Sequence, residues 1–232
     1  STMFSYQYAY LVLNLFIFSI WLILFVFRSD LRTKIIVMSL LVAPLGFTQF
    51  FYFRDYWHPA YLFGTVWGVV GIEDVLFSFF IGGITAVIYE EIFGIQYAKR
   101  HLKNHFWWML GFSVFGVLWL FVGNILLNLN SMHVSIAILL LTGVSILIFR
   151  HDLLKDAFYS GVLIGGLMFI FYVLCFNTMF DGIVQKWWLL NHISGILVLG
   201  VPLEELMWAF SWGFVAGPTY EFFTGRKFKK SF

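Results

Sequence analysis

Two pairs of neighbouring acidic residues lie in stretches that are otherwise apolar enough for a lipid bilayer. Glu73 and Asp74 belong to "GIEDVLFSFF", and Glu204 and Glu205 belong to "VPLEELMWAF". A charged side chain near the bilayer centre costs about 2.5–3.5 kcal/mol, and such residues usually serve a function. Carboxyl groups that meet in a dry site cannot all ionise, so protonated acids then stand beside charged ones. The four residues therefore predict acid–base chemistry inside a membrane.

The composition requires lipid as the main surroundings of the chain. Hydrophobic residues make up 61% of the 232 residues and charged residues 11%, whereas a soluble domain carries about 25% charged residues. The net charge of +2 and the scattered basic residues exclude a nucleic-acid partner. The single Cys175 excludes an intrachain disulfide and a cysteine-cluster metal site. Membrane lipids are the expected partners, and the sequence leaves a homo-oligomer open.

Seven segments hold the roughly 20 apolar residues that one crossing of a membrane needs. Backbone groups in lipid must bond within their own segment, so these segments are expected to be helices and the fold all-α. With the N-terminus outside, every Lys and Arg except Arg54 and Lys186 falls on the inner side, as the positive-inside rule requires. The chain is thus predicted to be a multi-pass protein of the cytoplasmic membrane, N-out and C-in. The predicted spans are 6–27, 35–53, 65–89, 106–128, 133–149, 158–180 and 193–222.

The two acidic stretches belong to an internal repeat. Shifting the sequence by 131 residues (204 − 73) places Glu204 on Glu73, and it also places Tyr220 on Tyr89. Predicted helices one to three then match helices five to seven, and helix four inverts the chain between them. Both repeats cross the membrane in the same direction, which is a parallel 3+1+3 duplication. The expected units are 1–94 (first repeat), 95–131 (linker helix) and 132–232 (second repeat and basic C-terminal tail).

A pseudo-twofold axis between the repeats would let the two acidic helices face each other. Successive residues point about 100° apart on a helix, so Glu73 is expected to meet Glu204 or Glu205 rather than Asp74. A structural role is the alternative. An acid can pair with a basic residue, but no Lys or Arg lies within a span at this depth, or it can cap a helix that Pro202 starts. Capping would explain one acid in each pair but hardly two.

The inner ends of the two acidic helices carry the dipeptides Tyr89-Glu90 and Tyr220-Glu221. Tyr is typical of the aromatic belt at a membrane interface, so these glutamates are expected to reach water. His192 precedes the second acidic pair and either shuttles protons or lines the interface.

Aromatic side chains crowd the acidic helices. Packing in the core or against lipid explains most such stripes. Beside a proton donor they gain a second use, because a desolvated cation over an aromatic face gains about 2 kcal/mol and dry walls keep water from quenching a carbocation. The candidate substrate-binding residues are Trp67, Phe77, Phe80, Trp208, Phe210, Trp212 and His192.

The motifs together resemble one known family. The paired "GIEDVL" and "PLEELM" helices each end in Tyr-Glu, and "WHPAY" (57–61) precedes the first. In these features the chain is similar to the integral-membrane lycopene cyclases, found as two small subunits or as one fused chain. The resemblance implies lycopene or a related acyclic carotenoid as substrate, β-ionone rings in the product, and the two acidic pairs as the functional acids. The chain departs from the family at Gly71, usually proline, and at Asp74, commonly Glu.

The implied reaction is an isomerisation and not a redox step. An acid protonates the terminal double bond, an internal double bond attacks the tertiary cation, and a carboxylate removes a ring proton. We therefore expect a cofactor-free isomerase without a metal, whose hydrocarbon substrate enters sideways from lipid. Glu73 and Glu204 are expected to be the central acid and base, with Asp74 and Glu205 tuning their protonation.

Two other functions stay open at this point, and a third is disfavoured. A proton-coupled transporter can also have 3+1+3 repeats and acids near the middle of the membrane, and Pro202 and Pro218 with Gly217 could break its helices. A related terpene cyclase could act on another isoprenoid. An intramembrane prenyltransferase is disfavoured, because its diphosphate would need buried Arg or Lys and carboxylates spaced along a helix.

Overall fold

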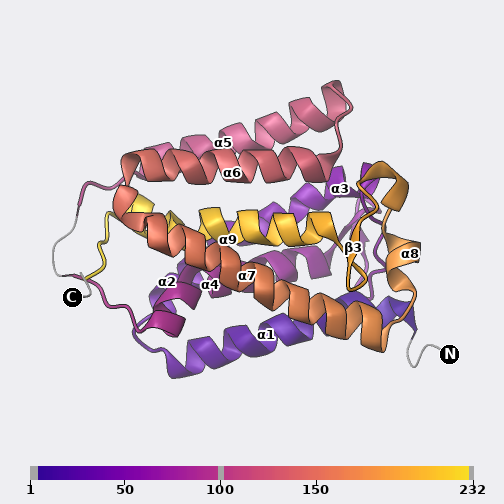
Figure 1. Cartoon of the computed structure of the whole chain (residues 1–232), viewed down its shortest axis with the longest axis horizontal. Coiled ribbons are helices and arrows are strands. Elements are labelled where there is room, and N and C mark those ends of the chain that lie inside the picture. Colours follow the sequence, from indigo (N-terminus) through magenta and orange to yellow (C-terminus); the bar gives the residue numbers. More distant parts are fainter. Residues whose placement is uncertain (1–4, 99–101, 230–232) are drawn as a thin grey trace.

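The computed structural model describes residues 5–98 and 102–229 and consists almost wholly of helices (Figure 1). The predicted inner basic residues Lys99, Arg100 and Lys230 lie outside the described residues. Strands occur in the described part of the chain only as two short hairpins, so the fold is nearly all-α, as predicted. The helices are α1 (Ala9–Phe27), α2 (Arg32–Val42), α3 (Gln49–Asp55), α4 (Ile72–Phe93), α5 (Phe106–Phe121), α6 (Ser131–Phe149), α7 (Leu154–Tyr172), α8 (Ile183–Trp187) and α9 (Leu203–Thr224).

Six helical runs in the described residues are long and apolar enough to cross a membrane. The second run joins α2 to α3 through a short 3-10 segment, and the fourth and sixth end in π-helical turns. The chain is therefore a multi-pass membrane protein by the length and composition of its helices. The six runs are Tyr6–Phe27, Arg32–Asp55, Ile72–Phe93, Phe106–Leu126, Ser131–Phe149 and His151–Met179.

The seventh predicted helix forms as α9 but is not among these six runs. It packs against α4, α5, α6 and α7, and Figure 1 shows it running between α6 and α7. Because other helices surround it, α9 can carry polar and small residues that a lipid-facing helix would not. Seven crossings and the N-out orientation stay predictions.

Both acidic helices begin later than the sequence pattern suggests. The predicted spans start at residues 65 and 193, whereas α4 starts at Ile72 and α9 at Leu203. A hairpin precedes each helix: β1 (Thr65–Val66) pairs with β2 (Val70–Gly71), and β3 (Leu197–Val198) pairs with β4 (Val201–Pro202). The turns of these hairpins contain residues with left-handed backbone conformation, among them Gly68 and Gly200. This conformation interrupts a helix, so the apolar residues before α4 and α9 form hairpins instead.

Several structural features recur 131 residues apart. The helices α4 and α9 have the same length, and each ends at a left-handed glycine, Gly94 or Gly225. Isolated β-bridges join Trp57 to Trp188 and Tyr97 to Phe228, and the two partners in each bridge are also separated by 131 residues (188 − 57 and 228 − 97). Equivalent residues that meet each other are what a twofold axis between two repeats produces.

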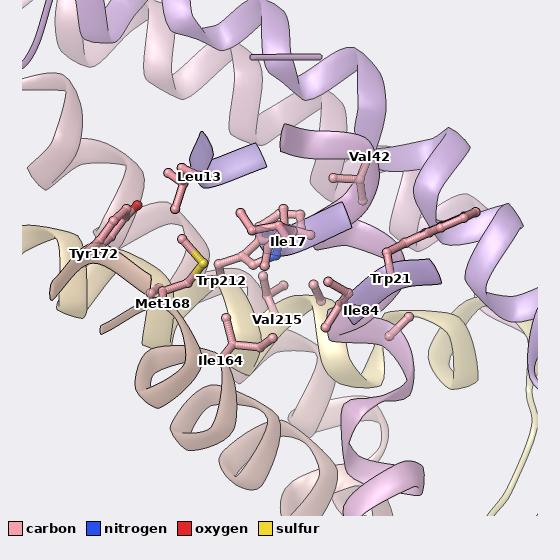
Figure 2. Packing of buried hydrophobic residues seen from close by; sticks show 14 of the residues in the cluster. Leu13, Ile17, Trp21, Val42, Ile84, Ile164, Met168, Tyr172, Trp212 and Val215 are labelled. Carbon is pink, nitrogen blue, oxygen red and sulfur yellow. The ribbon is translucent and has the colours of Figure 1, made fainter. Parts of the chain in front are cut away.

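The hydrophobic core lies where α1, α4, α7 and α9 meet. Figure 2 shows Leu13 and Ile17 of α1 among Ile164 and Met168 of α7, with Trp212 of α9 beside them. One buried hydrogen bond ties the acidic helices together at this level, from the Trp212 indole to the hydroxyl of Thr85 in α4 at 3.1 Å. This core holds α4 and α9 against each other below their acidic residues.

Candidate active site

An apolar cavity of about 370 Å³ follows α9 for most of its length. Its lining on α9 extends from Glu205 to Phe223, which is 18 residues (223 − 205), or about 27 Å at 1.5 Å per residue. The other walls come from α1, the α2–α3 run, α4, α5 and α6. A long, narrow and mostly apolar space fits an extended hydrocarbon better than a compact polar solute.

Part of the cavity lining is exposed at the surface of the bundle. Leu41 of α2, and Leu110 and Val117 of α5, line the cavity and are also exposed on the outside of the bundle. These three side chains belong to helical runs with the composition of membrane spans. The cavity lining therefore includes exposed side chains of helices that are apolar enough to cross a membrane.

Asp74 and Glu205 are the members of the acidic pairs that line the cavity. Both are buried, and both lie at the end of the cavity where α4 and α9 begin. The Tyr10 hydroxyl donates to Oδ1 of Asp74 at 2.8 Å, and the Gly71 backbone N–H donates to Oδ2 at 2.8 Å. On the other side, Oε1 of Glu205 accepts from the Tyr56 hydroxyl and the Trp188 indole, at 2.8 and 2.9 Å.

Glu73 and Glu204 are buried too, but they are not among the residues that line this cavity. Oε1 of Glu73 accepts from the backbone N–H groups of Leu62 and Phe63, at 2.6 and 3.0 Å. Oε1 of Glu204 accepts from the Ser194 N–H at 2.8 Å. These two glutamates therefore hold the loops that precede the hairpins. The expectation that Glu73 and Glu204 are the central acid and base stays a prediction, and in this structure Asp74 and Glu205 line the cavity instead.

Each acidic pair occupies the first turn of its helix. Backbone N–H groups there lack partners within the helix, and the helix dipole favours negative charge. Asp74 also accepts from the backbone N–H of Gly71, the residue that precedes the helix. The capping interpretation thus holds for Asp74, and the helix start helps to stabilise a buried carboxylate there. Capping alone does not explain why a cavity lies beside these carboxyl groups.

The predicted aromatic residues divide into two groups. Phe77, Trp208 and Trp212 line the cavity, and the rings of Trp208 and Trp212 stack at 6.1 Å. The remaining candidates point elsewhere. Trp67 is 76% exposed in the β1–β2 turn, Phe80 packs on Trp21, Phe210 packs on Phe158, and His192 is exposed in the loop before β3.

Several site residues were not found by sequence reasoning. Tyr10, Tyr56 and Trp57 line the cavity, and Trp57 contacts Tyr10 and Trp188 at ring distances of 5.3 and 5.1 Å. They connect Asp74 to Glu205 through a continuous set of rings. The only sequence signal for them was Trp57, which repeats as Trp188.

Tyr56 and Tyr61 lie outside the membrane-spanning helical runs, beside the acidic residues, and both keep their protons. Burial, and then the charge of Glu205, raises the pKa of Tyr56 well above its usual value. Burial, and then the charge of Asp74, raises the pKa of Tyr61 in the same way. Both hydroxyls are therefore available as hydrogen-bond donors at neutral pH.

At the opposite end of α4 and α9, the Tyr-Glu dipeptides do not behave as predicted. Glu90 and Glu221 are fully buried rather than in water. Lys34, only 3% exposed, places Nζ 2.5 Å from Oε1 of Glu90 and 2.8 Å from Oε1 of Glu221. The Tyr97 hydroxyl lies within hydrogen-bond reach of the same two oxygens and can donate its one proton to either. The predicted interface is instead a buried ionic cluster.

A family model described as lycopene cyclase matches residues 7–93 and 130–223, which include both acidic pairs and most of the chain. The chain belongs to the lycopene cyclase family. No curated protein and no solved structure matches it. Membership in this family supports a membrane enzyme of carotenoid biosynthesis with carotenoid cyclase activity, and it does not favour a transporter.

The two segments that match the lycopene cyclase family leave α5 between them unmatched. This helix nevertheless supplies one wall of the cavity, from Phe106 to Leu120. The segment that the repeat treats as a linker is therefore part of the candidate substrate site. Among the described residues, no cluster of three or more His, Cys, Asp or Glu is placed to hold a metal ion.

Proposed function

We propose that this protein is an intramembrane carotenoid β-cyclase that converts a terminal end of lycopene, or of a related acyclic carotenoid, to a β-ionone ring. One observation carries the proposal: two buried carboxyl groups, Asp74 and Glu205, stand at one end of a long apolar cavity. The cavity suits a polyene, and the two carboxyl groups suit a reaction that only moves protons.

The reaction adds one proton to the substrate and removes another. A carboxylic acid protonates the terminal double bond and leaves a tertiary carbocation. The neighbouring internal double bond then attacks this cation, which forms the ring bond and moves the positive charge into the ring. A carboxylate takes a ring proton, and the electrons of that C–H bond become the ring double bond. The product is an isomer of the substrate, so neither an oxidant nor a reductant is needed.

The aromatic lining supports the cationic steps. Trp57, Phe77, Trp208 and Trp212 surround the carboxyl end of the cavity. An aromatic face stabilises a desolvated cation by about 2 kcal/mol. The same walls exclude water, which would otherwise add to the carbocation and end the reaction as an alcohol.

The four acids take two kinds of role in this proposal. Asp74 and Glu205 face the cavity and exchange protons with the substrate. Glu73 and Glu204 are positioning residues that hold the loops over the outer end of the cavity through backbone N–H groups. The proposal further includes seven crossings of the cytoplasmic membrane, an outer N-terminus and the 3+1+3 arrangement of units 1–94, 95–131 and 132–232.

Membranes that contain the protein and are supplied with lycopene test the function. Ring-containing product is expected from the wild type, and Asp74→Asn and Glu205→Gln are both expected to lose the β-ring product. Glu91→Gln is the matched control, because Glu91 also lies on α4 but is exposed and pairs with Arg28. Unchanged β-ring product from both acid variants would overturn the proposal. Uptake of a solute into sealed vesicles without any conversion would favour a carrier instead.

A further inference from the structure

The two carboxyl groups that face the cavity are equivalent in the repeat but differ in how their oxygens are bonded. Asp74 and Glu205 both occupy the third position of their helices, 131 residues apart. The residue three positions earlier is Gly71 in one repeat and Pro202 in the other. A proline has no backbone N–H. The hydrogen bond that Gly71 gives to Asp74 therefore has no counterpart at Glu205.

Both oxygens of Asp74 accept hydrogen bonds. Oδ2 accepts from the Gly71 N–H, which can only donate, and Oδ1 accepts from the Tyr10 hydroxyl. Such an arrangement is satisfied completely by a carboxylate. A proton on Oδ1 would require the Tyr10 hydroxyl to turn around, and the hydroxyl of Tyr61, the other tyrosine beside Asp74, already donates to the Val69 carbonyl. The arrangement thus favours a charged Asp74 before the reaction starts.

The hydrogen bonds to Glu205 converge on one oxygen. Oε1 accepts from both the Tyr56 hydroxyl and the Trp188 indole, and an indole N–H can only donate. Oε1 is therefore unable to hold a proton in this arrangement, and a proton on Glu205 is confined to Oε2. Pro202 offers Oε2 no backbone donor. The other polar neighbour of this carboxyl is the hydroxyl of Tyr172, which can accept as well as donate.

From this asymmetry we infer that Glu205 is the proton donor and Asp74 the base of the cyclisation, and that Tyr56 and Trp188 are positioning residues that fix this direction. The inference rests on the proposed function. When Oε2 gives its proton to the terminal double bond, negative charge develops on the Glu205 carboxylate. The two donors are already in place on Oε1, so they stabilise this charge without rearrangement. The ring proton then passes to Asp74, and one proton moves from Asp74 back to Glu205 before the next turnover.

The two roles predict different effects on substrate consumption and on the products when each residue is replaced. Without the donor no cation forms, so Glu205→Gln should leave the substrate unconverted. Without the base the cation still forms, so Asp74→Asn should consume substrate and release rings with the double bond elsewhere, or a ring alcohol. Tyr10→Phe should shift the product ratio in the same direction as Asp74→Asn. These product ratios do not depend on how much of the protein is folded.

The positioning residues are tested by removing one hydrogen-bond donor at a time. Tyr56→Phe and Trp188→Phe should each lower kcat at least ~10-fold, with KM changed less than ~2-fold and the product ratio unchanged. Trp187→Phe is the matched control: it is the neighbouring buried indole, it contacts Trp57 and Phe176, and it should keep kcat. Pro202→Ala supplies the missing backbone N–H to Glu205 and should slow substrate consumption by favouring the carboxylate.

The measurements are made on the full chain in detergent or liposomes with lycopene, in H₂O and in D₂O. The inference is supported if the ratio of the rates in H₂O and D₂O rises in Tyr56→Phe and Trp188→Phe. A mere loss of folded protein would lower both rates equally and leave this ratio unchanged. The inference is overturned if Asp74→Asn blocks consumption while Glu205→Gln releases isomeric rings, or if both donor variants keep the wild-type kcat. If the wild type itself forms no ring from any acyclic carotenoid, the proposed function fails and not this assignment alone.

Discussion

Replacing Lys34 by Met should destabilise the protein strongly without touching the cavity that holds the acids. Lys34 is the shared partner of Glu90 and Glu221, and all three side chains are buried. Met keeps most of the volume of the Lys stem but removes the charge. The variant would leave two buried carboxylates within reach of the Tyr97 hydroxyl, whose one proton can serve only one of them at a time. Breaking a buried ion pair by removing one partner costs about 3–5 kcal/mol.

This loss should be visible as a lower thermal midpoint. For a chain of this length, 1 kcal/mol corresponds to roughly 2–4 °C, so Lys34→Met is expected to lower Tm by about 6–20 °C. Circular dichroism of the purified protein in detergent micelles measures the shift. Lys155→Met is the matched control, since Lys155 is exposed, and it should leave Tm within ~2 °C of the wild type.

A rescue variant separates the effect of the lost charge on stability from the effect of altered packing. If uncompensated charge causes the loss, then Lys34→Met combined with Glu90→Gln and Glu221→Gln should regain most of the stability, because neutral groups can replace a buried ion cluster at little cost. A Lys34→Met protein as stable as the wild type would refute the reasoning, since it would mean that the two glutamates need no counter-charge. A triple variant less stable than Lys34→Met would refute it as well.

Two further predictions concern the contacts that hold the bundle. Gly213→Ala should cost about 1–3 kcal/mol of unfolding free energy, because a Cβ at Gly213 would overlap the Ser160 carbonyl of α7; Gly111→Ala, at an open position, should not. SDS titration of the folded protein in micelles measures both, and equal stability of the two variants would contradict the expected close approach of α7 and α9. Asp55→Ala should cost about 1–3 kcal/mol, since Asp55 accepts from the N–H and hydroxyl of Ser131 at the start of α6. A loss below ~0.5 kcal/mol would show that α6 does not depend on this contact.

The position of the acids in the chain could be predicted, but the orientation of their side chains could not. The pattern located both pairs in two helices, but it started these helices at residues 65 and 193 and so did not place the acids in the first turns, where the structure has them. Which member of a pair faces the cavity depends on the rotation of the helix, and neighbouring residues differ by about 100°. In α4 that rotation follows from packing against α1, α2 and α9, which are distant in sequence. Asp74 rather than Glu73 faces the cavity for this reason.

Lys34 shows a second limit of sequence reasoning. It lies near Arg28 and Arg32, so it was counted with the basic residues of an inner loop. Its partners are 56 and 187 residues away, and no local pattern connects them. Trp67 shows a third limit: its neighbours are apolar, but left-handed backbone at Trp67 and Gly68 makes a turn where a helix was predicted.

The predicted repeat would account for two acids in the proposed site, and the departures from the repeat would account for their different surroundings. In a perfect repeat the two carboxyl groups would have identical surroundings, so the surroundings would not decide which group donates a proton and which accepts one. The chain differs between repeats at the residues that bond these oxygens: Gly71 against Pro202 at the helix start, and Asp74 against Glu205 in side-chain length. The equivalent indoles differ as well, because Trp57 donates to Gln49 whereas Trp188 donates to Glu205. The proposed assignment of Glu205 as donor and Asp74 as base depends on that inequality, so substitutions that make the two surroundings more alike should reduce the preference for this assignment before they destabilise the fold.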